Sequence, residues 1–176
     1  MNFRQAVMHD LPGLKSVFGK IVHKLNEENG QIWDDIYPCE FFEGDIENHR
    51  LYVLENNGVI VSAFALWGSD AGETHIKWED DGAKALYFGR FGVNVDYLRG
   101  GIGSMMLHRA IELAGNEGVE YLRLFVADNN VPAIKFYIKN GLKKAAGSYV
   151  EEFDDGTYLQ ESAFEIKISN QIINYI

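Results

Sequence analysis

The chain has 176 residues, of which 47% are hydrophobic and 24% charged, and its formal net charge is −10. This length and composition suit one soluble globular domain with a substantial core. The negative charge argues against nucleic acid or an anionic membrane as the main partner, because such proteins need a basic face for phosphate groups. A cationic or amine substrate is compatible with it, although the charge also serves solubility alone.

The cysteine count and the N-terminus indicate the compartment. Cys39 is the only cysteine, so no internal disulfide can form, and a reducing compartment is the simplest location. The first residues lack the apolar segment of a signal peptide, and no apolar run approaches the length of a membrane span. The five histidines are scattered without metal-ligand spacing. We therefore expect a cytoplasmic protein with no membrane partner and no metal site.

The first part of the chain predicts a short strand and two helices. Residues 2–7 read as a strand, and Asp10 followed by Pro12 is a helix-start signal. Apolar residues at helical spacing carry this helix to Asn29-Gly30. A loop rich in aromatic and acidic residues follows, and then a second short helix contains Phe41, Phe42 and Ile46.

The middle of the chain predicts a β-hairpin and a long connection. Residues 50–54 and 59–67 are strand-like, and Asn57-Gly58 between them is a strong hairpin signal. Residues 68–83 are polar and contain glycine, and long connections of this kind are often functional. This connection is a candidate wall of an acceptor pocket.

The last half alternates strands and helices. A strand over 86–95, a helix from Ile102 to about Gly118 and a strand over 121–126 form a crossover unit, so these two strands should be parallel. Asn130 should cap a helix over 132–140 that Gly141 ends. Two further strands are expected over 142–151 and 158–168, and the apolar tail over 169–176 could dock on its own domain or form a dimer contact.

A glycine cluster, Gly100, Gly101 and Gly103, lies where the strand over 86–95 meets the next helix. Glycines at a helix N-terminus let an anion approach unpaired N–H groups, so a phosphate-bearing ligand is the first hypothesis. A P-loop would need Lys-Ser/Thr at the end of the loop, and a dinucleotide fingerprint would need a small residue at Met106. A tight turn without a ligand remains an alternative.

The pattern continues beyond the glycines. Phe91 to Val95, Gly101-Ile102-Gly103, Asn130 to Ala133 and Phe136 to Leu142 follow one another in order. Together they resemble the GNAT superfamily of acyl-CoA-dependent N-acyltransferases, whose pattern is strand, Gln/Arg-x-x-Gly-x-Gly/Ala, helix, strand, Asn-x-x-Ala, and a helix carrying Tyr and ending in Gly-Phe. Leu98 replaces the Gln/Arg of the family and Leu142 replaces its final Phe.

The resemblance implies an α/β fold. It predicts a mixed central sheet of about six to seven strands flanked by about four helices, with parallel central strands splayed at the acyl-CoA site. It also predicts a single domain over residues 1–168, followed by the tail over 169–176.

The resemblance further implies acetyl-CoA as co-substrate. Backbone N–H groups of the turn would bind its pyrophosphate, and Arg99, Lys135 and Lys139 could supply local positive charge. Main-chain groups at the end of the strand would bind the pantetheine arm. The implied cofactor-binding residues are Val93, Asn94, Val95, Arg99, Gly100, Gly101, Ile102, Gly103, Ser104, Asn130, Ala133 and Tyr137.

Tyr137 resembles the tyrosine that protonates the leaving thiolate in the family, with an amphipathic packing role as the alternative. Trp33 and Tyr37 are implied contacts of the acceptor, although both could simply close the core. The strand over 86–95 contains no Asp or Glu. The base would then be a water chain or a carboxylate such as Asp34, Asp35 or Glu79, and none of them is singled out.

The resulting hypothesis is a cytoplasmic N-acetyltransferase, monomeric or homodimeric, that transfers an acetyl group from acetyl-CoA to a primary amine by direct attack in a ternary complex. The amine could belong to a small molecule, a peptide or a protein. Two alternatives are a non-catalytic acyl-CoA-binding regulatory module and a fold retained only for interaction.

Overall fold

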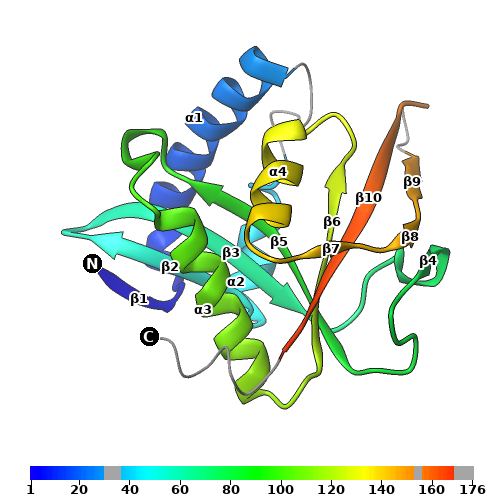
Figure 1. Ribbon diagram of the computed structural model, residues 1–176. Coiled ribbons are helices and arrows are strands. Elements are labelled where there is room, and N and C mark those ends of the chain that lie inside the picture. Colours follow the sequence, from blue (N-terminus) through cyan, green and yellow to red (C-terminus); the bar gives the residue numbers. More distant parts are fainter. Residues whose placement is uncertain (30–36, 153–155, 169–176) are drawn as a thin grey trace. The chain divides into compact units, whose positions relative to one another are not determined.

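The chain combines α-helices and β-strands, and only its part over residues 85–144 alternates strands with α-helices (Figure 1). The computed structural model describes residues 1–29, 37–152 and 156–168. Contacts divide the chain into two units, the first made of residues 1–66 and 89–108 and the second of residues 67–88 and 109–176. Strand β5 (Ala85–Val93) and helix α3 (Ile102–Asn116) run through both units. A single domain over 1–168 stays a prediction, and the tail over 169–176 lies outside the described residues.

The first unit confirms the early elements of the sequence analysis. Its strands follow the order β1-β2-β3-β5, and β2 pairs antiparallel with both β1 and β3. Asn57 and Gly58 both have positive φ at the β2–β3 turn, as the Asn-Gly signal predicts. The elements before β5 are β1 (Asn2–Gln5), η1 (Met8–Asp10), α1 (Leu11–Asn29), α2 (Phe42–Glu47), β2 (Leu51–Asn56) and β3 (Val59–Trp67).

Helix α1 packs closely on β5 within the first unit. A Cβ at Gly92 would lie 2.8 Å from the side chains of Phe18 and Ile21, so only glycine permits this approach. Phe18 is fully buried and packs edge-to-face against Phe42 of α2, with ring centroids 4.8 Å apart. The apolar face of α1 is therefore part of the core, as its helical spacing predicts.

The second unit is built around the long strand β10 (Tyr158–Lys167), which runs antiparallel to β6 (Tyr121–Ala127) (Figure 1). The strand order is β5-β6-β10-β7, and β9 also pairs with β10. The first residues of β5 pair with β6 in parallel, from Ala85–Tyr121 to Tyr87–Arg123, which confirms the predicted crossover. Its other elements are η2 (Glu73–His75), β4 (Ile76–Lys77), α4 (Val131–Lys139), β7 (Lys143–Lys144), β8 (Ala146–Gly147) and β9 (Tyr149–Glu152).

Two predicted strands differ from the structure. The strand expected over 142–151 is three short strands, because the chain bends at Gly147, whose φ is +104° and where a Cβ would lie 2.7 Å from the carbonyl oxygen of His75. The strand expected to reach Val95 ends at Val93, and residues Val95–Tyr97 form a 3-10 turn, η3. The larger sheet of the described chain has eight strands rather than six to seven. A mixed sheet flanked by helices is nevertheless confirmed.

Candidate functional site

The glycine turn lies at the start of α3 in the first unit. Arg99 and Gly101 both have left-handed φ, +66° and +77°, so the chain reverses sharply before the helix begins at Ile102. Gly100 and Gly101 are exposed, and no heavy atom beyond the adjacent residues lies within 4 Å of a Cβ built at Gly101. The first N–H groups of a helix have no acceptor within that helix, and the first turn of α3 carries no acidic side chain. The turn can therefore accept an anion on its main chain.

Asn94 holds the end of β5 in place ahead of this turn. Its N–H donates to the carbonyl of Val61 over 2.8 Å, and its side-chain amide donates to the carbonyl of Ile60 over 3.0 Å. Its Oδ1 accepts from the N–H of Asp96 over 3.1 Å, which caps η3. Asn94 is only 3% exposed, so its polar groups serve the first unit internally. Any cofactor contact on this segment would then come from the half-buried neighbours Val93 and Val95.

Arg90 occupies an unusual position within β5. Its φ of +49° is left-handed, which is strained for a residue other than glycine. The guanidinium lies 4.5 Å from the ring centroid of Phe41, and its Nη1 is 3.1 Å from Oδ2 of the fully buried Asp45. Arg50 binds the other oxygen of the same carboxylate. These contacts hold the side chain of Arg90 in place at the residue where the backbone of β5 is left-handed.

Of the predicted acceptor contacts, Tyr37 lies near this network around Arg90. Tyr37 packs edge-to-face on Phe41, with ring centroids 5.8 Å apart, and so continues the stack over Arg90. Trp33, Asp34 and Asp35 lie outside the described residues.

Asn130 and Ala133 belong to the second unit. The Oδ1 of Asn130 accepts the N–H of Ala133 over 3.2 Å, and Pro132 lies in the first turn of α4. The predicted cap is therefore confirmed. Asn130 is 9% exposed, so its place in the motif has a structural explanation in addition to any ligand contact.

Tyr137 lies on α4 with 7% of its surface exposed. Its ring packs against Phe88 and Phe164, with centroids 6.5 and 6.4 Å away, and against its neighbour Phe136. The ring is thus part of the core of the second unit, and the catalytic role of its hydroxyl stays a prediction. A phenylalanine at this position would keep that packing while removing the hydroxyl.

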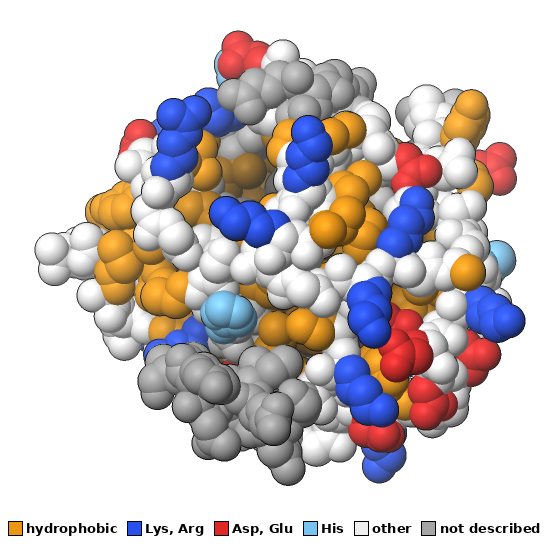
Figure 2. All heavy atoms as spheres, in the orientation of Figure 1, with side chains coloured by type: hydrophobic (Ala, Val, Ile, Leu, Met, Phe, Trp, Pro, Cys, Tyr) orange, Lys and Arg blue, Asp and Glu red, His pale blue; other side chains and the backbone are white. Residues whose placement is uncertain are grey.

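The outer side of α4 is basic and apolar. Lys135, Ile138 and Lys139 are all exposed, and basic and hydrophobic side chains adjoin one another over this helix in Figure 2. These lysines give local positive charge in a chain whose net charge is −10.

Glu79, one of the carboxylates considered as a base, faces solvent. Its side chain is 50% exposed, and its Oε2 lies 3.6 Å from Nζ of Lys143. Its N–H donates to Oε1 of Glu165 over 2.7 Å, so the residue mainly fixes the connection over 68–83.

Glu161 on β10 is an acidic residue that the sequence analysis did not single out. Burial, together with the neighbouring carboxylates of Glu151, Asp70 and Asp128, raises the pKa of its carboxyl to about 8. The only sequence signal is that Glu161 and Glu165 share one face of a strand of mixed polar and apolar residues. That signal marks a polar residue facing one side of the sheet but not what surrounds it.

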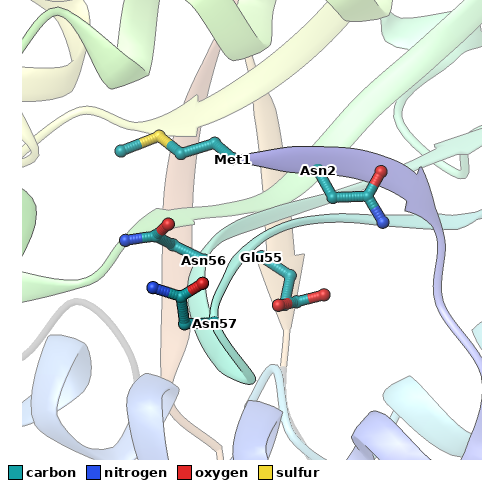
Figure 3. Close-up of a pocket in the computed structure, with 5 residues that line it drawn as sticks. All are labelled: Met1, Asn2, Glu55, Asn56 and Asn57. Carbon is teal, nitrogen blue, oxygen red and sulfur yellow. The ribbon is translucent and has the colours of Figure 1, made fainter.

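A hollow in the first unit lies away from the motif residues. Met1, Asn2, Glu55, Asn56 and Asn57 line it, and Figure 3 shows their side chains around the β2–β3 turn. Its volume of about 240 Å³ is below the range of ordinary small-molecule sites. It contains none of the predicted site residues.

Within residues 1–29, 37–152 and 156–168, no group of three or more His, Cys, Asp or Glu side chains is arranged to hold a metal ion. None of the helices in these ranges is long and apolar enough to span a bilayer.

Comparisons with known proteins give a consistent assignment. Residues 19–142 match the model of the acetyltransferase (GNAT) family. A Bacillus subtilis (strain 168) protein named "Putative phosphinothricin acetyltransferase YwnH" is 28% identical over 103 residues, which are 58% of this chain. The match also spans only 58% of the length of that relative.

Two solved structures share the fold. An acetyltransferase of the GNAT family from Streptococcus agalactiae 2603 superposes with a TM-score of 0.74 at 20% identity, covering 96% of this chain and 95% of the other. The ribosomal-protein-S18-alanine N-acetyltransferase from Escherichia coli superposes with a TM-score of 0.64 at 18% identity, covering 96% and 94%. At these identities the likeness concerns the fold.

Proposed function

Because the chain belongs to the acetyltransferase (GNAT) family, we propose that it transfers an acetyl group from acetyl-CoA to a primary amine. The observation that carries this proposal is the open turn from Arg99 to Ser104 at the start of α3. Left-handed φ and glycines without side chains leave its main-chain N–H donors accessible. A diphosphate is the kind of group that such a turn binds.

Main-chain groups of several segments have distinct roles in this proposal. N–H groups from Arg99 to Ser104 hold the pyrophosphate of acetyl-CoA, and main-chain groups of Val93 and Val95 hold the pantetheine arm. Asn130 and Ala133 contact the cofactor at the start of α4. Asn94 acts through the fixed geometry of this segment, since its own polar groups are already bonded.

The reaction is direct attack in a ternary complex. The neutral amine attacks the thioester carbon, the C–N bond forms, and the C–S bond breaks. Main-chain N–H groups near Val93 stabilise the carbonyl oxygen as negative charge develops on it. The hydroxyl of Tyr137 gives a proton to the departing sulfur.

The acceptor is a primary amine of a small molecule, a peptide or a protein, and Trp33 and Tyr37 contact it. One relative is named for phosphinothricin and one structural neighbour for an alanine of ribosomal protein S18, so the names span both kinds of acceptor. The acidity of this chain favours acceptors that carry additional positive charge. We also propose a cytoplasmic protein with a single domain over 1–168, acting as a monomer or homodimer.

Turnover of acetyl-CoA with a panel of amines, read as release of free thiol, tests the proposal. We expect acetyl-CoA to raise the melting temperature, and one class of amine to release thiol in step with formation of the acetylated product. Binding of acetyl-CoA without turnover on any amine would favour a non-catalytic acyl-CoA-binding regulatory module. Failure to bind any CoA species would favour a fold retained for interaction alone.

A further inference from the structure

Glu161 lies beside the end of β6 within the second unit. Its Cα is directly opposite that of Ala127, the last residue of β6, and on its other side opposite that of Tyr149 on β9. Three residues after Ala127 comes Asn130, which caps the helix that carries Tyr137. Neighbouring strands are roughly 5 Å apart, so Glu161 lies one strand away from the segment that leads into α4.

The surroundings of Glu161 are partly aromatic. Tyr149 packs edge-to-face on Phe125, with centroids 6.0 Å apart, and a Cβ at Gly72 would lie within 3 Å of both rings. The connection after β3 therefore fits closely over these rings. Aromatic faces attract ammonium groups, and the attraction is stronger where water is partly excluded.

The charges around Glu161 come from several elements. Asp70 lies in the connection after β3, Asp128 follows β6, and Glu151 lies on β9, and each raises the pKa of Glu161. Among the described residues, no ion pair involves any of these four carboxylates.

The basic groups on this side of the second unit have other partners. Arg123 is bonded to Glu165, which lies four residues after Glu161 on the same face of β10, and His75 packs against Tyr149. A cation brought by a substrate would therefore supply positive charge that the unit itself does not place at Glu161. Within the described chain the four carboxylates are not arranged as a metal-ligand group.

We propose that Glu161 accepts the proton that the ammonium group of the acceptor must lose before the amine attacks acetyl-CoA. This inference rests on the proposed function and names its base, which the central strand does not supply. Aromatic rings from β6 and β9 hold the ammonium, and the neighbouring carboxylates favour acceptors with further positive charge.

The protons balance across the reaction. The ammonium nitrogen loses one proton to the carboxylate of Glu161, and its lone pair then forms the C–N bond as the C–S bond breaks. The second nitrogen proton is lost to solvent after the C–N bond forms, while Tyr137 protonates the sulfur and recovers a proton from solvent. Glu161 finally gives its proton to water, so the net products are the amide, the thiol and one proton.

The pH dependence of kcat/KM for the amine tests this role. In the free protein Glu161 must lose a proton near pH 8 before it can act, so kcat/KM should rise with pH and level off above about 8. The midpoint of this rising limb of the pH profile should lie at the same pH for amines whose own pKa values differ. A limb that moves with the amine, or no limb from about pH 6 to about pH 9, would overturn the proposal.

Variants give the second measurement. We expect Glu161→Gln to lower kcat/KM about 100-fold or more at pH 8 and to remove the limb, while Glu161→Asp recovers part of the rate. Calorimetry should show unchanged affinity for acetyl-CoA. The matched control is Glu152→Gln, an exposed glutamate on β9, which should behave as wild type.

The outcomes separate the two proposals. Wild-type activity in Glu161→Gln with the limb retained would overturn the role of Glu161 and leave the proposed function intact. A wild-type protein that acetylates no amine would overturn both. If Glu161→Gln does not fold, the wild-type limb measured across the amine panel decides.

Discussion

Arg123 on β6 and Glu165 on β10 form a buried ion pair across directly opposed positions of the two strands. Nε of Arg123 lies 3.3 Å from Oε2 of Glu165, and each side chain is 5% exposed. Arg123 also donates to the carbonyl of Asp80 over 2.7 Å and stacks 4.4 Å from the ring centroid of Trp78. The pair therefore fastens the connection over 68–83 to the sheet of the second unit, and this connection carries Asp70 to its place near Glu161.

Removing one partner of this pair should be costly. Arg123→Met leaves Glu165 buried without its cation, and we expect the free energy of unfolding to fall by about 3–5 kcal/mol. Urea unfolding measures this. The control is Lys143→Met, which breaks the exposed pair with Glu79 and should cost no more than about 1 kcal/mol. Equal losses in the free energy of unfolding would show that the buried pair contributes no more than the exposed pair.

Gly101 should be required for binding of CoA. Gly101→Glu places a negative charge and a side chain at the anion turn, and we expect calorimetry to detect no CoA binding. Gly118→Glu is the matched control, because Gly118 also has left-handed φ, +73° against +77°, and also has open space around its Cβ position. Both variants carry the same backbone strain and charge. CoA binding lost to a similar extent in both would contradict a site at the turn.

Tyr137→Phe separates the hydroxyl from the ring. Because the ring packs against Phe88 and Phe164, the variant should keep the stability of the protein. We expect kcat to fall by about tenfold, with CoA affinity nearly unchanged, since a thiol is already a good leaving group and gains little from an acid. Tyr158→Phe, at a tyrosine that is 73% exposed, is the control. Unchanged turnover in Tyr137→Phe would remove the hydroxyl from the mechanism.

The sequence predicted those parts of the fold that depend on local chemistry. Asn57-Gly58 predicted the hairpin, and Asn130 with Pro132 predicted the start of α4. The glycines before Ile102 predicted the turn. Each of these features follows from φ preferences or caps within a few residues. The sequence did not predict that the strand over 142–151 is interrupted. This interruption depends on the close approach of Gly147 to His75, and these two residues are far apart in the sequence.

The sequence left the base unassigned, and it did not single out Glu161 for the same reason. The strand over 158–168 also contains other polar and charged residues, so Glu161 has no special local signal. Its raised pKa depends on burial and on Asp70, Asp128 and Glu151 from other elements. The left-handed φ of Arg90 likewise has its support in Asp45 and Phe41. Properties that arise between distant segments need the folded structure.

Glu161 should also make stability depend on pH. Its pKa is higher in the folded protein, about 8, than in the unfolded chain, near 4.3, so the folded state binds more protons between these values. Stability should therefore fall as pH rises through this window, and the cost should be complete above about pH 8.

Glu161→Gln cannot ionise and lacks this cost. We expect the variant to match the wild type at about pH 4 and to exceed its free energy of unfolding by on the order of 2 kcal/mol at about pH 9. Urea unfolding at several pH values measures the difference, and Glu152→Gln should show no such trend because that side chain is exposed. If Glu161→Gln gains stability at high pH and loses acetyl transfer, the half-buried carboxylate of Glu161 lowers stability while it serves the reaction. A variant no more stable than wild type at about pH 9 would contradict the raised pKa itself.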